Sequence, residues 1–145
     1  MIQEIIEGIS SAIYEEFGGE FTIYSEEVKQ GLKEPCFIIS CVRTGHGAEM
    51  RRVYTQNNLF WVQYIPKENG REKAACYSAA ERLARCLEYI TVGGDLVRGV
   101  DMHYETNDGV LTFSVTYKMR VIARSDRFAD DTEMEAMQKS VNLKG

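Results

Sequence analysis

The sequence predicts an α+β fold, in which two helices pack on one face of a mainly antiparallel sheet in the order α-β-β-β-α-β-β. Three observations support this prediction. Residues 2–16 and 71–90 carry apolar side chains at helical spacing, and residues 36–42 form a short apolar run. Residues 96–124 alternate between apolar and polar side chains, which is typical of a long strand pair buried on one face.

The first helix is predicted over residues 2–16, because apolar side chains recur there at i, i+3, i+4 and i+7. Its apolar stripe consists of Ile2, Ile5, Ile6, Ile9, Ala12 and Ile13. Gly18-Gly19 is expected to end the helix, since glycine is common just past a helix C-terminus. Residues 21–24 follow as a short strand candidate.

A central strand is predicted over residues 36–42, and we expect both of its faces to be covered, because the run is apolar on both. Pro35 precedes it, where a residue without an N–H donor is tolerated. The helices would cover one face, and a second sheet layer or a partner subunit the other. Residues 43–51, which include Gly45-His46-Gly47, predict a turn or loose loop.

Residues 52–65 predict a long strand that ends at Pro66, with a bulge near residues 56–58 as one option. The second helix is predicted over residues 71–90. Its stripe consists of Ala75, Cys76, Ala79, Ala80, Leu83, Leu87 and Ile90. Gly93-Gly94 should end this helix and lead the chain into the final hairpin.

Residues 96–124 predict one long β-hairpin that turns at Asp108-Gly109, because both residues tolerate the positive φ of a tight two-residue loop. This loop would pair Tyr104 with Phe113, Met102 with Val115 and Val100 with Tyr117. A three-residue Asn-Asp-Gly loop would instead set Tyr104 against Thr112. We favour the two-residue loop, since a one-residue slip moves the apolar side chains of an arm to the wrong face.

With 145 residues, the chain suits one domain, which we place at residues 1–124. The remaining residues, 125–145, form an acidic tail that is either flexible or docks on a neighbouring subunit. The formal net charge of −5 argues against a non-specific nucleic-acid binder. The sequence shows neither a long apolar span nor a signal peptide, so we expect the protein to fold in a cytoplasm without membrane contact.

No catalytic residue, cofactor or metal site is predicted. The four cysteines, Cys36, Cys41, Cys76 and Cys86, lack the short paired spacing of metal ligands and are interpreted as core residues. His103 has Asp101 and Glu105 on its own strand face, which could orient a general base, but a solvated polar face is the simpler interpretation. His46 lies between glycines, where nothing orients it.

Several segments carry a resemblance to a known family. They are the isoleucine-rich first helix, Phe21-Thr22-Ile23-Tyr24, the block Gly31-Leu32-Lys33-Glu34-Pro35-Cys36-Phe37-Ile38-Ile39, the strand end Tyr64-Ile65-Pro66, Glu81-Arg82-Leu83, His103-Tyr104-Glu105 and Asp108-Gly109-Val110-Leu111. With these segments, residues 1–124 resemble the phage tail terminator (tail completion) proteins of phages and phage-like elements of Gram-positive bacteria. The Gly31–Phe37 block is the most specific part.

The resemblance implies a structural virion protein without cofactor. It would form a homohexameric ring that caps the head-proximal end of the tail tube, stops its polymerisation and provides a surface for the neck, or that closes a headless tail-like bacteriocin. Expected partners are the tail tube protein and the sheath and neck proteins, with DNA only passing through the lumen. Candidate interface residues are Asn107, Asp108, Gly109, Lys118, Arg120, Met134 and Met137.

Two alternatives stay open. One is another head–tail joining protein of similar size. The other is a small ligand-binding or enzymatic domain that uses aromatic side chains such as Trp61, Tyr64, Tyr104 and Phe113, which in strands are more often core residues. Under the ring hypothesis, truncation at Arg124 is expected to weaken assembly.

Overall fold

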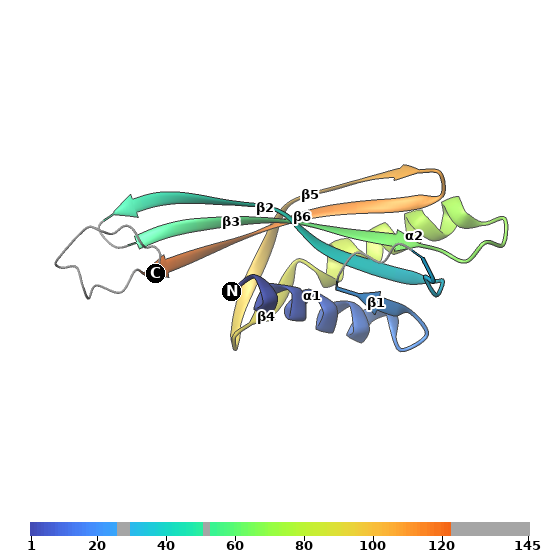
Figure 1. Cartoon of the computed structure of the whole chain (residues 1–145), viewed down its shortest axis with the longest axis horizontal. Coiled ribbons are helices and arrows are strands. Elements are labelled where there is room, and N and C mark those ends of the chain that lie inside the picture. The colour runs from blue at the N-terminus through green and yellow to red at the C-terminus, as the bar shows by residue number, and fades with distance from the viewer. Residues whose placement is uncertain (26–29, 51–52, 123–145) are drawn as a thin grey trace. The chain divides into compact units, whose positions relative to one another are not determined.

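The computed structural model describes residues 1–25, 30–50 and 53–122. Its elements are α1 (Ile2–Phe17), β1 (Thr22–Tyr24), β2 (Cys36–Met50), β3 (Val53–Ile65), α2 (Glu72–Cys86), β4 (Tyr89–Val92), β5 (Asp95–Asn107) and β6 (Val110–Ile122). The strands form a six-stranded sheet in the order β1-β2-β3-β6-β5-β4 (Figure 1). Two helices and a mostly antiparallel sheet confirm the predicted α+β class.

The chain divides into two compact units. The first comprises Met1–Thr44 and Asn58–Lys118, and it contains both helices. The second comprises Gly45–Asn57 and Met119–Gly145, and its described part is limited to strand segments. The predicted domain boundary after Arg124 lies outside the described residues and stays a prediction.

α1 has the predicted apolar face. Its buried residues are Ile5, Ile6, Gly8, Ile9, Ile13 and Phe17. The helix contacts β4 and α2, and Gly18 follows it with a φ of 88°. This left-handed backbone suits glycine, so the predicted stop is confirmed.

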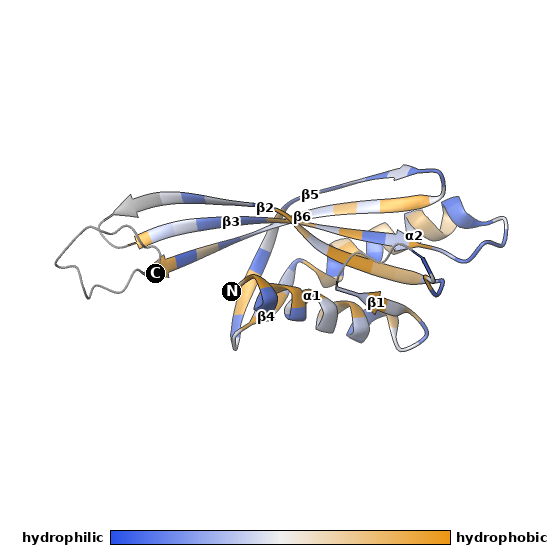
Figure 2. Ribbon diagram, in the orientation of Figure 1, coloured by the Kyte–Doolittle hydropathy of each residue, from blue (hydrophilic) through white to orange (hydrophobic). Residues whose placement is uncertain are grey.

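The start of β2 is covered on both faces, as expected from its composition. Cys36, Phe37, Ile38 and Ile39 are all buried in succession, and this stretch is continuously hydrophobic in Figure 2. The predicted loop over residues 43–51 is wrong, because β2 continues as a strand to Met50. Gly45 and Gly47 do not break it, since a strand paired with its neighbour gains ladder hydrogen bonds that offset the weak strand preference of glycine.

The second helix ends earlier than predicted, and a strand that the sequence analysis did not expect follows it. α2 stops at Cys86, and β4 pairs antiparallel with β5, Ile90 lying opposite Val97. Gly93 and Gly94 have φ values of 58° and 89°, as a tight two-residue hairpin turn requires. The element order is therefore α-β-β-β-α-β-β-β, and Gly93-Gly94 turns a hairpin instead of ending a helix.

The turn of the β5–β6 hairpin is confirmed, but its predicted register holds only near the tip. Asp108 and Gly109 both have positive φ, at 52° and 76°, and Tyr104 pairs with Phe113. A bulge between Val100 and His103 shifts the remaining pairs, so that Val100 faces Thr116 and Gly99 faces Tyr117. The predicted pairing of Val100 with Tyr117 is therefore wrong, and Met102 does not continue the regular ladder opposite Val115.

The shift occurs because there is no room for a side chain beside Tyr117. A Cβ atom on Gly99 would lie 3.0 Å from Tyr117 Cε1, 2.8 Å from Val115 Cγ2 and 2.7 Å from the Leu87 carbonyl oxygen. A residue with a side chain does not fit at this point. The bulge, with Asp101 at a φ of 53°, places glycine there instead of Val100.

The core joins both helices to the same face of the sheet. Phe17 of α1 packs on Phe37, with ring centroids 4.7 Å apart, and Phe37 packs on Tyr64 of β3 at 4.9 Å. Phe60 shares that face of β3 and packs on Tyr117, whose hydroxyl donates to the Leu87 carbonyl just after α2. Since residues two apart on a strand point the same way, α1 and α2 cover one face.

Candidate interaction surfaces

The tip of the β5–β6 hairpin is anchored on α2. The Cys76 thiol donates to the Gly109 carbonyl oxygen at 3.5 Å, and a Cβ on Gly109 would lie 3.7 Å from the Cβ of Glu72. The side chains of Asn107 and Asp108 remain exposed. The predicted interface tip therefore offers two polar side chains on a backbone that the subunit itself holds in place.

The strand face of His103 does not form an oriented catalytic group. Asp101, His103 and Glu105 are all exposed, and within the described chain His103 has no hydrogen bond or ion pair with either carboxylate. Its partner across the hairpin is Ser114, which is 5% exposed. No group of three or more potential metal ligands occurs among the described residues.

The other predicted interface residues fall in different places. Lys118 is exposed at the end of the first unit, and Arg120 is exposed in the second unit. Met134 and Met137 lie outside the described residues. His46 is an exposed residue of β2 in the second unit.

The four cysteines are free. Cys36 and Cys76 are buried, and Cys41 and Cys86 are half-buried. Burial raises the pKa of the Cys36 and Cys76 thiols, with smaller contributions from Glu34 and Glu72 respectively. Burial raises the pKa of Cys86 to about 12, with Glu16 adding to the rise. Because the thiolate is the reactive form of cysteine, these three thiols are poorly suited to nucleophilic chemistry at neutral pH.

Arg82 ties the two helices together. Its Nε lies 3.0 Å from Glu16 Oε2, and an Nη atom donates to the Glu16 carbonyl oxygen at 2.8 Å. The guanidinium also stacks over the Phe17 ring at 4.2 Å. The cation thus meets the negative end of α1, an arrangement that stabilises a helix C-terminus. In the sequence, Arg82 contributed only to the family resemblance, and this role was not predicted.

Within the described residues, two strand segments of the first unit lack a neighbouring strand on one side. β1 pairs with Cys36–Ile38, so among these residues no strand lies on that side of β2 from Ile39 to Thr44, a segment we name the β2 edge. β4 pairs only with Asp95–Arg98, and Gly99 donates its N–H to Glu88. Beyond the bulge, His103–Asn107 therefore has no strand on that side among the described residues, and we name it the β5 edge.

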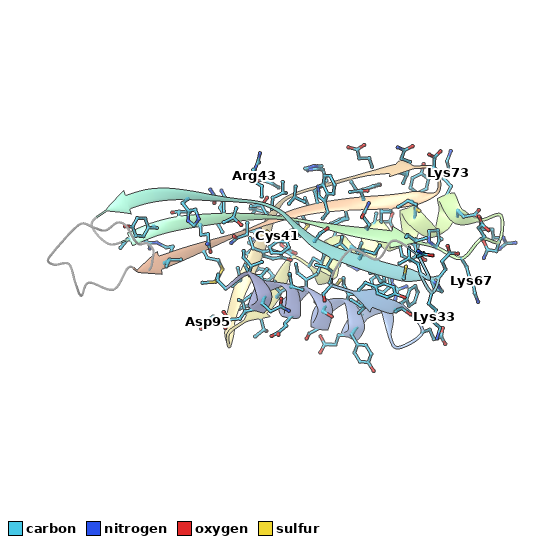
Figure 3. All side chains as sticks on the ribbon, in the orientation of Figure 1. Lys33, Cys41, Arg43, Lys67, Lys73 and Asp95 are labelled. Atoms are coloured by element: carbon cyan, nitrogen blue, oxygen red, sulfur yellow. The ribbon has the colours of Figure 1, made fainter. Side chains whose placement is uncertain are left out.

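Each edge exposes a large apolar side chain. Val42 on the β2 edge is 42% exposed, and Tyr104 on the β5 edge is 46% exposed. Trp61, on the neighbouring strand β3, is 40% exposed. The only charged residue of the β2 edge is Arg43, which is exposed on β2 (Figure 3), whereas the only acidic residue of the β5 edge is Glu105.

The family model described as "Phage tail terminator protein" matches residues 4–128. Since the match spans most of the chain, this protein belongs to the phage tail terminator family. The family consists of structural proteins of the phage tail, so the chain is a structural tail protein that works with other tail proteins in the virion.

No curated protein matches the chain. One solved structure shares 13% sequence identity, covers 83% of this chain and 96% of its own, and has a TM-score of 0.36, which is too low to support an argument. Among the described residues, neither helix has the length and apolar character needed to span a membrane.

Proposed function

We propose that the protein forms a homohexameric ring that caps the head-proximal end of the tail tube, stops tube polymerisation and presents the surface to which the neck is joined. Membership of the tail terminator family is the observation that carries this proposal. Terminating a tube that is built from stacked rings requires a subunit that presents one surface to the tube and others to its own copies.

The described surfaces are compatible with a ring. The β2 edge and the β5 edge are two different strand edges that no other described strand covers, as head-to-tail contacts require. A net charge of −5 suits a ring through which DNA passes without sticking, because unspecific DNA binding depends on basic surface. Tube protein, sheath and neck proteins are the proposed partners, in phages or tail-like particles of Gram-positive bacteria.

We propose that the hairpin tip, Asn107 to Gly109, contributes to the interface with the tube or with a neighbouring subunit, and that Lys118 and Arg120 each contribute separately to such an interface. The exposure of Asn107 and Asp108 on an anchored turn supports this assignment, since a rigid turn loses little entropy on binding. The tail after Arg124, including Met134 and Met137, is proposed to dock on a neighbouring subunit.

Electron microscopy of labelled particles tests the proposed location. Antibody directed against an epitope tag at the N-terminus is expected to mark one end of isolated tails, the end that joins the head where a head is present. Label along the whole tail, or at the distal end only, would contradict the proposal. Label on heads alone would point to the alternative role of a head-side joining protein.

A further inference from the structure

We infer that the ring is closed by strand pairing between copies: the β2 edge (Ile39–Thr44) of one copy pairs with the β5 edge (His103–Asn107) of the next, so that the sheet continues across the subunit interface. This inference rests on the proposed ring and names the surface that holds it together. The proposed partner of each edge is a second copy of this chain.

The strand order makes such a contact head-to-tail. The strand order is β1-β2-β3-β6-β5-β4, so the β2 edge and the β5 edge lie toward opposite edges of the sheet. One copy can therefore offer its β2 edge to one neighbour and its β5 edge to the other. A contact between two different surfaces generates a closed ring when the rotation between copies closes.

The strand directions also fit. In Figure 1 the arrowheads of β3 and β5 point the same way, and that of β2 points the opposite way. A β5 edge placed beside the β2 edge of a similarly oriented copy thus forms an antiparallel pair. This is the arrangement of the β5–β6 pair within the subunit.

The bulge sets where the β5 edge begins. Asp101, at a φ of 53°, interrupts the regular ladder between Val100 and His103. His103 to Asn107 then pairs regularly with β6 on one side, and no described strand lies on its other side. Unpaired N–H and C=O groups along an extended strand are a template for another strand. The β2 edge is a segment of similar length.

The other outer strands of the sheet are less suitable. β1 spans only Thr22–Tyr24. The outer side of β4 is occupied by α1, since a Cβ on Gly8 would lie 2.5 Å from the Thr91 carbonyl oxygen. The backbone of α1 therefore blocks a strand from pairing there. In the described part of the first unit, the β2 and β5 edges are the longer free segments.

Each edge carries one exposed charged side chain, of opposite sign on the two edges, and one exposed apolar side chain. Arg43 and Glu105 are exposed and of opposite sign, and Val42 and Tyr104 are both partly exposed apolar groups. Opposite charges and aromatic–aliphatic pairs across neighbouring strands stabilise a sheet. Across an interface, charge complementarity also selects the partner and the register.

Charge reversal on each edge tests the inference by native mass spectrometry and light scattering. Arg43→Glu and Glu105→Arg, each alone, are expected to raise the protein concentration needed for ring assembly about tenfold. The double variant, which restores opposite charges in a swapped arrangement, is expected to assemble nearly as well as the wild type. Lys67→Glu (Lys67 is labelled in Figure 3) and Glu81→Arg make the same charge changes at exposed positions off both edges and serve as controls.

The outcomes separate this inference from the proposed function. Circular dichroism melts should show that all variants fold. If the wild type forms a ring and the single reversals leave its assembly unchanged, the edges do not hold the ring, and the inference is wrong while the ring stands. If the single variants keep the ring but no longer bind tubes, the edges contact the tube protein, and the inference of pairing between copies is also wrong. A wild type that stays monomeric in the presence of tubes would instead contradict the proposed ring itself.

Discussion

The two ends of β5 differ in how they are held. At Gly99, near the start, the strand is pressed between the backbone after α2 and the side chains of Val115 and Tyr117, and its N–H donates to Glu88 at 2.7 Å. Beyond the bulge, His103–Asn107 pairs with β6 alone, and most of its side chains are exposed. One strand thus has a part that packs within the subunit and a part that we propose pairs with a neighbouring copy, with Asp101 between them.

The tight packing of β5 at Gly99 can be tested by adding a side chain there. Gly99→Val would place side-chain atoms where the Leu87 carbonyl and Val115 already lie, so we expect a loss of about 3 kcal/mol or more in the free energy of unfolding. Urea denaturation measures it. Gly45→Val is the matched control, because a Cβ at Gly45 meets nothing within 4 Å and φ there is not positive. Equal stability of the two variants would show that β5 is not tightly held at this point.

Tyr117→Phe measures the contribution of one hydrogen bond in the same region. The Tyr117 hydroxyl is buried and donates to the Leu87 carbonyl at 2.6 Å, so its loss leaves that carbonyl without this donor. We expect a loss of about 1–2 kcal/mol in the free energy of unfolding, with ring assembly unchanged when the folded fraction is equal. An unaltered urea midpoint would argue that the hydrogen bond is not formed in solution.

Two titratable groups next to Gly99 and Leu87 should make the protein less stable at alkaline pH. Burial raises the pKa of Cys86 from 9.0 to about 12, and it raises the pKa of Tyr117 as well. The folded state keeps protons that the unfolded state loses, so this stability is fully present below about pH 9 and is lost as the pH rises toward 12. One such group contributes a slope of at most about 1.4 kcal/mol per pH unit.

Urea titrations at several pH values between 8 and 10.5 measure this slope for the wild type and for Cys86→Ala. The variant should lose stability less steeply just above pH 9, since its thiol is absent. Identical slopes for the two proteins would show that Cys86 ionises equally in both states.

The smallest effect is expected for Asp101→Gly at the bulge. Asp101 has a φ of 53° and an exposed side chain, so Asp101→Gly should change the free energy of unfolding by no more than about 0.5 kcal/mol. Asp101→Val, a β-branched residue that rarely adopts positive φ, should cost about 1–3 kcal/mol. If thermal melts show the valine variant to be as stable as the glycine variant, the bulge does not have this conformation in solution.

Local chemistry in the sequence was sufficient for part of the fold. The isoleucine spacing identified α1, and Asp108-Gly109 identified the hairpin turn, because each depends on neighbouring residues only. β4 was missed because Ile90 fits two patterns: with Leu87 it continues the stripe of a helix, and with Val92 it forms the alternation of a short strand. The bulge was missed since it depends on the space beside Tyr117, which sequence spacing does not show.

The candidate surfaces were harder to predict than the fold. Exposure of the tip residues Asn107 and Asp108 follows from their place in a turn, but the contact of Gly109 with Cys76 depends on how α2 packs. The free edges depend on strand order and on the short lengths of β1 and β4. Val42 and Tyr104 are apolar residues at strand positions, so their exposure on these edges could not be recognised from the sequence.

The proposed capping of the tail tube can be measured by the growth of tubes in the presence of the purified protein. Tube subunits are polymerised from preformed tube ends with and without the wild-type protein, and tube lengths are measured by electron microscopy. With the wild-type protein, we expect tubes to stop lengthening and to carry a ring of additional density at one end. Tubes that keep growing at the same rate, at protein concentrations where the ring is fully formed, would contradict it.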